Sequence, residues 1–141
     1  MQRLNTYLVF DGDCADAMRF YERTLGGKLD MMTHADSPIA AQTPPGSANR
    51  IMHARLSFDD ATLMASDSMP GDPGGGKKGF SLALVYPTPA EAKRVFDALA
   101  QDGQVTMPLQ KTFWAEAFGM LVDRFGTPWM INGALANTGA D

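Results

Sequence analysis

The segment Thr6–Gly27, TYLVFDGDCADAMRFYERTLGG, decides the fold because a related segment, Ser81–Gly103, follows 75 residues later. The second copy reads SLALVYPTPAEAKRVFDALAQDG. Each copy is a short apolar run followed by an amphipathic helical pattern that ends at glycine. At this offset identical or conservative residues pair: Ala15/Ala90, Asp16/Glu91, Ala17/Ala92, Arg19/Arg94, Phe20/Val95, Tyr21/Phe96 and Glu22/Asp97. The repeat predicts two structural modules of one kind.

The first module continues from this segment as a series of strands. Asp13 is the expected N-cap of its helix, because an Asp carboxylate can accept from free N–H groups of the first turn. Strands are predicted over residues 28–33, 50–58 and 61–66, with a turn at 59–60. Residues 35–49 are rich in proline and small residues and predict a long surface loop, of the kind that often covers a site. His34, beside this loop, is expected to face solvent.

The second module repeats the order. Thr88 is the expected N-cap, Pro89 the first helical residue and Glu91 the third residue after the cap. Ala92, Val95, Phe96 and Leu99 form the apolar stripe of the helix. Strands are predicted over 81–86, 104–108, 112–118, 120–123 and 129–133. We therefore assign module one to residues 1–67, a linker to 68–79, module two to 80–134 and a tail to 135–141. Gly74-Gly75-Gly76 belongs to the linker and is not a phosphate-binding loop, because neither a GK[ST] sequence nor a helix follows it.

Composition excludes several classes of function. The chain has 141 residues, a net charge of −4 and scattered Lys and Arg, so a nucleic-acid partner is not expected. The apolar runs are too short to cross a membrane, and no basic region followed by an apolar run marks a secretory signal at the N-terminus. Cys14 is the only cysteine, which suits a reducing cytoplasm. Ten methionines are many, and methionine fills cores or lines adaptable binding surfaces.

With the two modules in place, the chain resembles the vicinal oxygen chelate superfamily, which includes glyoxalase I and the bleomycin-resistance proteins, and within it the PhnB-like group. The residues that carry the resemblance are YLVFDG from Tyr7, Phe20-Tyr21, Met52-His53-Ala54, LMASD from Leu63, Phe113-Trp114 through Gly119, DRFG from Asp123, and Pro128-Trp129. The resemblance implies an α+β fold of two βαβββ modules, whose curved mixed sheets form a shared cleft, with the helices on the convex side. It also implies a homodimer, in which a module from each chain can pair.

The superfamily's usual chemistry uses one metal ion bound by His, Glu or Gln side chains. Transferring that pattern to this chain places Asn5 or Thr6, Ala65, Ser81 and Asn132 at the ligand positions. These residues supply no imidazole or carboxylate, and neutral Ser and Asn oxygens are weak ligands for a catalytic divalent ion. We therefore expect no metal and no cofactor.

The residues themselves offer two candidates for proton transfer. The neutral imidazole of His53 could act as a base near pH 7, and Arg55 shares its strand face, which suits an anionic ligand. A half-buried histidine held by one hydrogen bond is an equal alternative. Trp114, Glu116 and Phe118 alternate along another strand, as a ligand platform or as a packed aromatic cluster, with packing slightly favoured. Tyr7, Ser81 and Asn132 complete the set of expected ligand-binding residues, whereas Asp123 is expected to stabilise a turn.

Three functions follow from these candidates. The first is a metal-independent enzyme acting on a small polar or anionic metabolite, with His53 or Glu116 transferring the proton. The second is a protein that sequesters a small molecule without turnover, as the bleomycin-resistance proteins do. The third is a metal-dependent enzyme that uses His53 and Glu116 as ligands. A ubiquinone methyltransferase, a label carried by some PhnB-like relatives, is not expected, because no glycine-rich strand-to-helix loop is present to hold S-adenosylmethionine.

Overall fold

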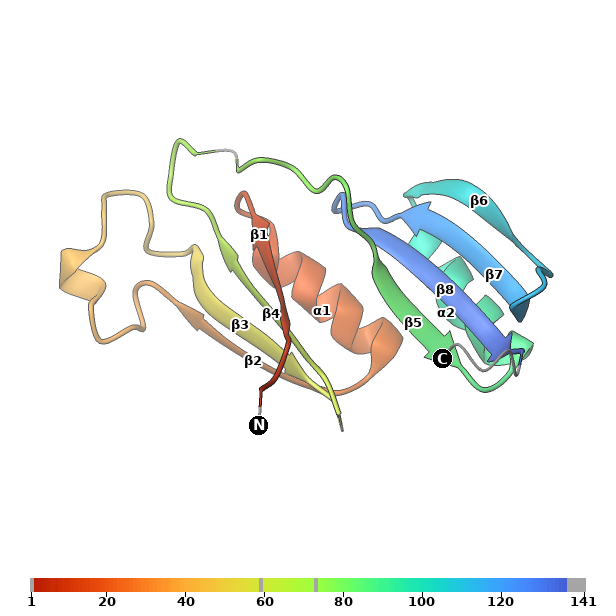
Figure 1. Ribbon diagram of the computed structural model, residues 1–141. Helices are drawn as coiled ribbons and strands as arrows, with labels where there is room; N and C mark the ends of the chain where they lie inside the picture. The colour runs from red at the N-terminus through yellow and green to blue at the C-terminus, as the bar shows by residue number, and fades with distance from the viewer. Residues whose placement is uncertain (1, 59, 73, 137–141) are drawn as a thin grey trace. The chain divides into compact units, whose positions relative to one another are not determined.

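The computed structural model describes residues 2–58, 60–72 and 74–136, and these form two compact units. The first unit spans residues 1–75 and the second spans 76–141. Each unit is a four-stranded mixed sheet with one α-helix against one face, so the predicted α+β fold of two repeated modules is confirmed (Figure 1).

The first unit contains β1 (Thr6–Phe10), α1 (Cys14–Leu25), β2 (Lys28–Thr33), the short 3₁₀ helix η1 (Ala40–Gln42), β3 (Ile51–Ser57) and β4 (Thr62–Asp67). The strand order is β1-β4-β3-β2, in which β1 and β4 are parallel and the other neighbours are antiparallel. Helix α1 packs on β2, β3 and β4.

The second unit repeats this topology with β5 (Leu82–Tyr86), α2 (Pro89–Ala100), β6 (Gln104–Gln110), β7 (Ala115–Val122) and β8 (Pro128–Leu135). The strand order β5-β8-β7-β6 again places the first strand parallel to the last. Residues 59 and 73, which the predicted turn and linker include, lie outside the described residues, as do residues 137–141 of the predicted tail. Strand β8 continues through Leu135, which the sequence analysis assigned to the tail.

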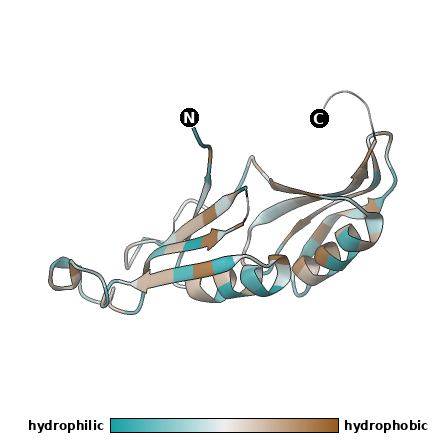
Figure 2. Ribbon diagram, turned by 90° about the horizontal axis from the view of Figure 1, so that it is seen from below, coloured by the Kyte–Doolittle hydropathy of each residue, from teal (hydrophilic) through white to brown (hydrophobic). Residues whose placement is uncertain are grey.

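Both helices bury the face that their periodicity predicts. In α2, the buried residues are Ala92, Val95, Phe96 and Leu99, the stripe read from the sequence. Thr88 accepts a hydrogen bond from the backbone N–H of Glu91 at 3.2 Å, and Pro89 begins the helix, as predicted. Figure 2 shows the alternation of polar and apolar residues along both helices. Each helix therefore holds its sheet through one apolar stripe.

The N-terminus of α1 is held differently from the prediction. Asp13 occupies the N-cap position, but its side chain makes no capping hydrogen bond. Asp67, at the end of β4, takes that role: its Oδ1 accepts from the backbone N–H groups of Gly12 at 2.8 Å and Cys14 at 3.0 Å. Its Oδ2 accepts from the N–H of Ile51 at 2.8 Å. One buried carboxylate thus joins the helix start to the start of β3.

The long loop of the first unit is more ordered than its composition suggested. His34 was predicted to face solvent, but only 5 % of it is exposed, and its backbone N–H donates to the carbonyl of Arg50. This bond extends the pairing of β2 and β3 into the base of the loop, where the imidazole ring of His34 is buried. Ser37 and Ser47 are buried as well, and their hydroxyls donate to carbonyls within the loop. The loop is therefore a folded extension of the β2–β3 hairpin (Figure 1).

The second unit corrects a predicted break in the chain. The sequence suggested separate strands over 112–118 and 120–123, but β7 runs without interruption through Gly119. A Cβ atom at Gly119 would lie 2.6 Å from Cε2 of Phe96 in α2. The glycine is therefore needed where the helix approaches the strand closely, and it does not end the strand.

Gly133 has the same role in β8 and offers a test. An added Cβ would lie 2.7 Å from Cβ of Ala92 and 3.0 Å from the carbonyl oxygen of Thr88. We expect Gly133→Ala to lower the free energy of unfolding by about 1–3 kcal/mol, because α2 must move off the sheet. Urea denaturation measures this, with Gly75→Ala as the matched control, since no atom lies within 4 Å of the Cβ that would be added there. An equal effect of both substitutions would contradict the close packing of α2.

No helix among the described residues is long and apolar enough to cross a membrane.

Candidate functional site

Each sheet has one face packed against its helix and a second face, here called its open face. In the first unit, Leu8, Ala54, Leu56 and Ala65 are buried on the helix side. The residues that alternate with them form the open face. Strand register places Tyr7 beside Met64, Met64 beside Arg55, and Arg55 beside Asp30, so these four form one row across the sheet.

His53 lies on the same open face, one row from Arg55. It pairs with Met32 of β2, and Ser66 of β4 pairs with Val9 of β1 on the same face. The rings of Tyr7 and His53 are 6.3 Å apart at an interplanar angle of 37°. Asp30, Met31, Met32 and His53 line a shallow pocket of about 160 Å³. The structure therefore brings together three of the residues named from the sequence: Tyr7, His53 and Arg55.

Arg55 carries a charge that the described part of the chain does not neutralise by an ion pair. Its side chain is exposed, and Asp30 lies opposite to it in the register without a salt bridge between the two. By contrast, Arg50 is engaged: its guanidinium contacts Asp11 at 2.9 Å and donates to the carbonyl of Ser68. Arg55 is thus a cation of this face that can bind an anion from solution.

The open face of the second unit is apolar and aromatic. One row consists of Val85, Asn132, Phe118 and Gln110 on β5, β8, β7 and β6. The next row consists of Ala83, Met130, Met120 and Met107. Sequence analysis named Asn132 and Phe118 but missed the methionines, although their alternation with Leu121 and Ile131 of the core was a usable signal. Three methionines side by side form a deformable surface.

Aromatic rings border Asn132 on this face. The rings of Trp114 and Phe118 are 5.1 Å apart at 72°, and Phe113 meets Trp114 edge-to-face at 4.8 Å. Phe118 is buried, whereas Glu116 is exposed. Ser81 precedes β5 and, by alternation with Leu82, belongs to the open side. The aromatic cluster predicted around Trp114 and Phe118 is therefore present, but the carboxylate of Glu116 is not buried among the rings.

The donors at the family's metal positions do not fit a catalytic divalent ion. Ala65 was placed at one position, but it is fully buried on the helix side, and Ser66 is the residue of β4 that faces the open side. Ser66, like Asn5, Ser81 and Asn132, offers only a neutral oxygen. Among the described residues no three His, Cys, Asp or Glu side chains gather in a group that could hold a metal ion. His53 and Glu116 lie in different units.

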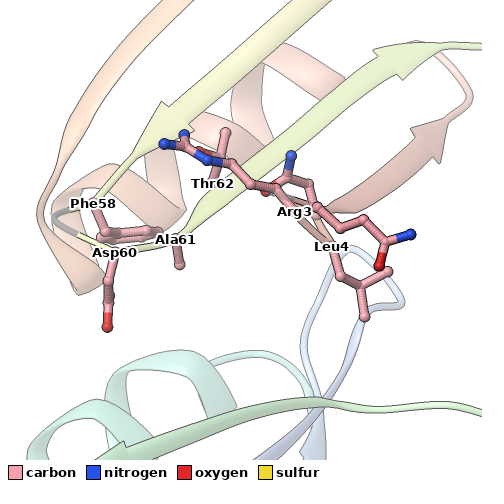
Figure 3. Close-up of a pocket in the computed structure, with 8 residues that line it drawn as sticks. Arg3, Leu4, Phe58, Asp60, Ala61 and Thr62 are labelled. Atoms are coloured by element: carbon pink, nitrogen blue, oxygen red, sulfur yellow. The ribbon is translucent and has the colours of Figure 1, made fainter.

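A larger pocket, of about 380 Å³, lies away from these residues (Figure 3). It is lined by the N-terminal segment and by the turn between β3 and β4, and includes Arg3, Leu4, Phe58 and Thr62. In Figure 3 the side chain of Arg3 extends towards the turn, while Leu4, which is fully exposed, points the other way. The pocket is a gap beside an extended segment, and its charged lining residues are Arg3 and Asp60.

Burial raises the pKa of Tyr86 above its usual value of 10.0, with Arg94 opposing and Glu91 adding to the effect. Tyr86 pairs with Gly133 on the helix side of β5. Its hydroxyl is therefore not a group of the open face.

Comparison with known proteins identifies the family of this chain. The model of the glyoxalase/bleomycin resistance protein/dioxygenase superfamily matches residues 3–131. The chain belongs to this superfamily. Protein YjdN of Escherichia coli is 40 % identical over 141 aligned positions, which cover 92 % of this chain and 93 % of YjdN.

Two solved structures agree with the fold. Protein PA1353 of Pseudomonas aeruginosa is 46 % identical, with a TM-score of 0.87, over 94 % of this chain and 98 % of PA1353. A PhnB protein from Bacillus cereus is 28 % identical, with a TM-score of 0.77, over 94 % of this chain and all of that chain. The resemblance to the PhnB-like group seen in the sequence is therefore confirmed.

Proposed function

We propose that the protein binds a small anionic metabolite on the open face of its first unit. Arg55 is the anchor for the anion, and His53 and Tyr7 are its polar neighbours. The single observation that carries the proposal is the strand register, which gathers these three side chains on one face. A guanidinium binds carboxylates and phosphates through two parallel hydrogen bonds, so it fixes both the position and the orientation of such a ligand.

His53 is the proposed proton-transfer group, which makes the protein a metal-independent enzyme. A neutral imidazole can take a proton from a ligand held at Arg55 and return it. The positive charge of Arg55 stabilises the negative charge that builds up on the ligand when the proton leaves.

A specific observation favours binding without turnover as the second candidate. No hydrogen bond orients the imidazole of His53 within the described residues, and its nearest aromatic neighbour is Tyr7 at 6.3 Å. Catalytic histidines are normally oriented by a third group. A protein that sequesters its ligand needs Arg55 and the pocket but not this orientation.

A binding experiment tests the shared part of both candidates. We expect Arg55→Gln to weaken the binding of small carboxylates and phosphates about tenfold or more, because one charge-assisted contact is lost. Calorimetric titration of the ligands found by a thermal-shift screen of such anions measures the change. Arg19→Gln, which removes the same charge from the exposed side of α1, is the matched control and is expected to bind as the unmodified protein does.

Equal binding by the Arg55 and Arg19 variants would refute the anion site. Turnover then separates the two candidates. His53→Asn is expected to stop the reaction while leaving ligand binding within about threefold if His53 transfers the proton. Binding without any product in the unmodified protein supports sequestration.

We also propose that the protein is a cytoplasmic homodimer. Its support is the family, the single cysteine and the exposed apolar side chains of both open faces, among them Val9 at 46 % and Val85 at 56 % exposure. Light scattering that gives a monomer mass at every concentration would contradict the dimer.

A methyltransferase is not proposed, although the name given to the Bacillus cereus protein suggests a 3-demethylubiquinone-9 3-methyltransferase. The connection between β1 and α1, where a cofactor anion would bind in a dinucleotide-type fold, is already engaged. Its N–H groups at Gly12 and Cys14 donate to the carboxylate of Asp67. A second anion would meet a buried negative charge there.

A further inference from the structure

The imidazole of His34 is buried at the base of the β2–β3 loop and takes no part in the candidate site. Only 5 % of the residue is exposed, and its Nδ1 is shielded from solvent without a hydrogen-bond partner among the described residues. Histidine is the side chain whose charge ordinarily changes close to neutral pH. A buried imidazole with a shielded, unpartnered nitrogen therefore calls for a reason.

The backbone of the same residue holds the base of the loop together. Its N–H donates to the carbonyl of Arg50 at 3.0 Å. Its carbonyl accepts from the N–H of Ser37 at 3.2 Å and from the hydroxyl of Ser37 at 2.8 Å. The next residue, Ala35, donates to the carbonyl of Ala48 at 3.0 Å. Displacing the ring of His34 would therefore disturb the hydrogen bonds that close the loop.

A protonated imidazole does not suit this position. Histidinium carries a proton on both ring nitrogens, so Nδ1 would present an N–H donor where no described group accepts. A positive charge would also lie in a buried position, which is costly without an ion pair.

No ion pair in the described part of the chain joins His34 to a carboxylate. The charged and titratable side chains on the neighbouring ends of β1, α1, β3 and β4 and in the loop are those of Asp11, Asp13, Asp36, Arg50, His53 and Asp67. Arg50 and Asp11 pair with each other at 2.9 Å, and both oxygens of Asp67 accept from backbone N–H groups. Asp36 is exposed. The charge of a protonated His34 would thus be compensated only after the ring has left the loop.

We propose that His34 is a pH-sensitive latch of the β2–β3 loop. The neutral imidazole holds the loop closed, and the loop opens when the ring takes up a proton, because Nδ1 then reaches water. A free imidazole ionises at about pH 6.5, so the loop is fully held above this pH and loosens as the pH falls below it. Opening reaches the ends of β2 and β3, where Thr33 pairs with Ile51. The inference does not depend on the proposed anion site.

Amide hydrogen exchange of the full chain, read by nuclear magnetic resonance, tests the latch. Suitable conditions are about pH 7.5 and about pH 5.5, on either side of the ionisation of a free imidazole. An opening that takes up one proton becomes about tenfold more favourable between them. After correction for the pH dependence of the exchange chemistry, we expect the N–H groups of His34, Ala35 and Arg50 to lose about tenfold in protection. The N–H of Phe96, in helix α2 of the other unit, is expected to keep its protection.

Variants assign the effect to one ring. His34→Phe keeps a ring but has no nitrogen to protonate, so we expect its loop to be equally protected at both pH values. His53→Phe is the matched control, because His53 is the other histidine of the chain, and it is expected to keep the tenfold change. A measurement on the unmodified chain serves if His34→Phe does not fold. There, the nitrogen signal of Nδ1 of His34 is expected to report protonation over the same pH range in which the loop loses protection.

Equal protection of the loop at both pH values in the unmodified chain would overturn the inference. A pH dependence that persists in His34→Phe, or that disappears in His53→Phe, would overturn it as well. Protonation of Nδ1 while the loop stays protected would do the same, since it would show that the closed loop accepts the charge.

Discussion

Replacing Asp67 by Ala is expected to lower the free energy of unfolding by about 3–5 kcal/mol, one of the two largest effects anticipated for a single substitution in this chain. Asp67 is 6 % exposed, and its carboxylate accepts from three backbone N–H groups, those of Gly12, Cys14 and Ile51. Removing it leaves all three donors in a buried region without an acceptor. The start of α1 and the start of β3 lose their common anchor at once.

Asp67→Asn is expected to be nearly as harmful. A carboxamide has one oxygen acceptor, and its NH₂ group would face an N–H that needs an acceptor. Urea denaturation followed by far-ultraviolet circular dichroism is the suitable measurement, because both tryptophans, Trp114 and Trp129, belong to the second unit.

Asp13→Ala is the matched control, since Asp13 occupies the N-cap position without a capping hydrogen bond. We expect it to change the free energy of unfolding by less than about 0.5 kcal/mol. If Asp13→Ala were the more destabilising variant, the conventional cap read from the sequence would be right and the carboxylate of Asp67 dispensable.

This contrast shows where sequence reasoning succeeds. Helix α2 was predicted in detail because each of its signals is local: Thr88, Pro89 and Glu91 lie within four residues, and the apolar stripe follows at helical spacing. The cap of α1 comes from a residue 53 positions away from Cys14. No local pattern encodes such a partner, because it exists only after β4 has paired beside β1.

The same distinction between local and long-range signals applies to the candidate site. Alternation along one strand was sufficient to place His53 and Arg55 on one face. The addition of Tyr7, Met64 and Ser66 required the pairing of three strands, and pairing register is set by the assembled sheet. A slip of one residue explains why Ala65 was named where Ser66 stands. His34 was misplaced because the ordered loop that covers it could not be predicted from its proline-rich composition.

Substitution of Asp123 is the second change for which we expect a large loss of stability. The sequence predicted the role of this residue, which is to stabilise a turn. Asp123 is 3 % exposed. Its Oδ1 accepts from the N–H groups of Phe125 at 2.8 Å and Thr127 at 3.1 Å, and its Oδ2 accepts from Nε1 of Trp129 at 2.8 Å. The Asp123-Arg124-Phe125-Gly126 sequence indicated the turn, but not the buried indole that completes the network.

We expect Asp123→Ala to lower the free energy of unfolding by about 3 kcal/mol, because a buried turn and a buried indole lose their acceptor together. Tryptophan fluorescence during urea denaturation reports this directly, since Trp129 is itself a partner of the carboxylate. Asp97→Ala is the control within the same unit: its carboxylate is exposed and pairs with Lys93 one helical turn away, so about 0.5 kcal/mol or less is expected. If Asp123→Ala were no more harmful than Asp97→Ala, the turn would be held by its backbone bonds between Asp123, Gly126 and Thr127 instead of by the carboxylate.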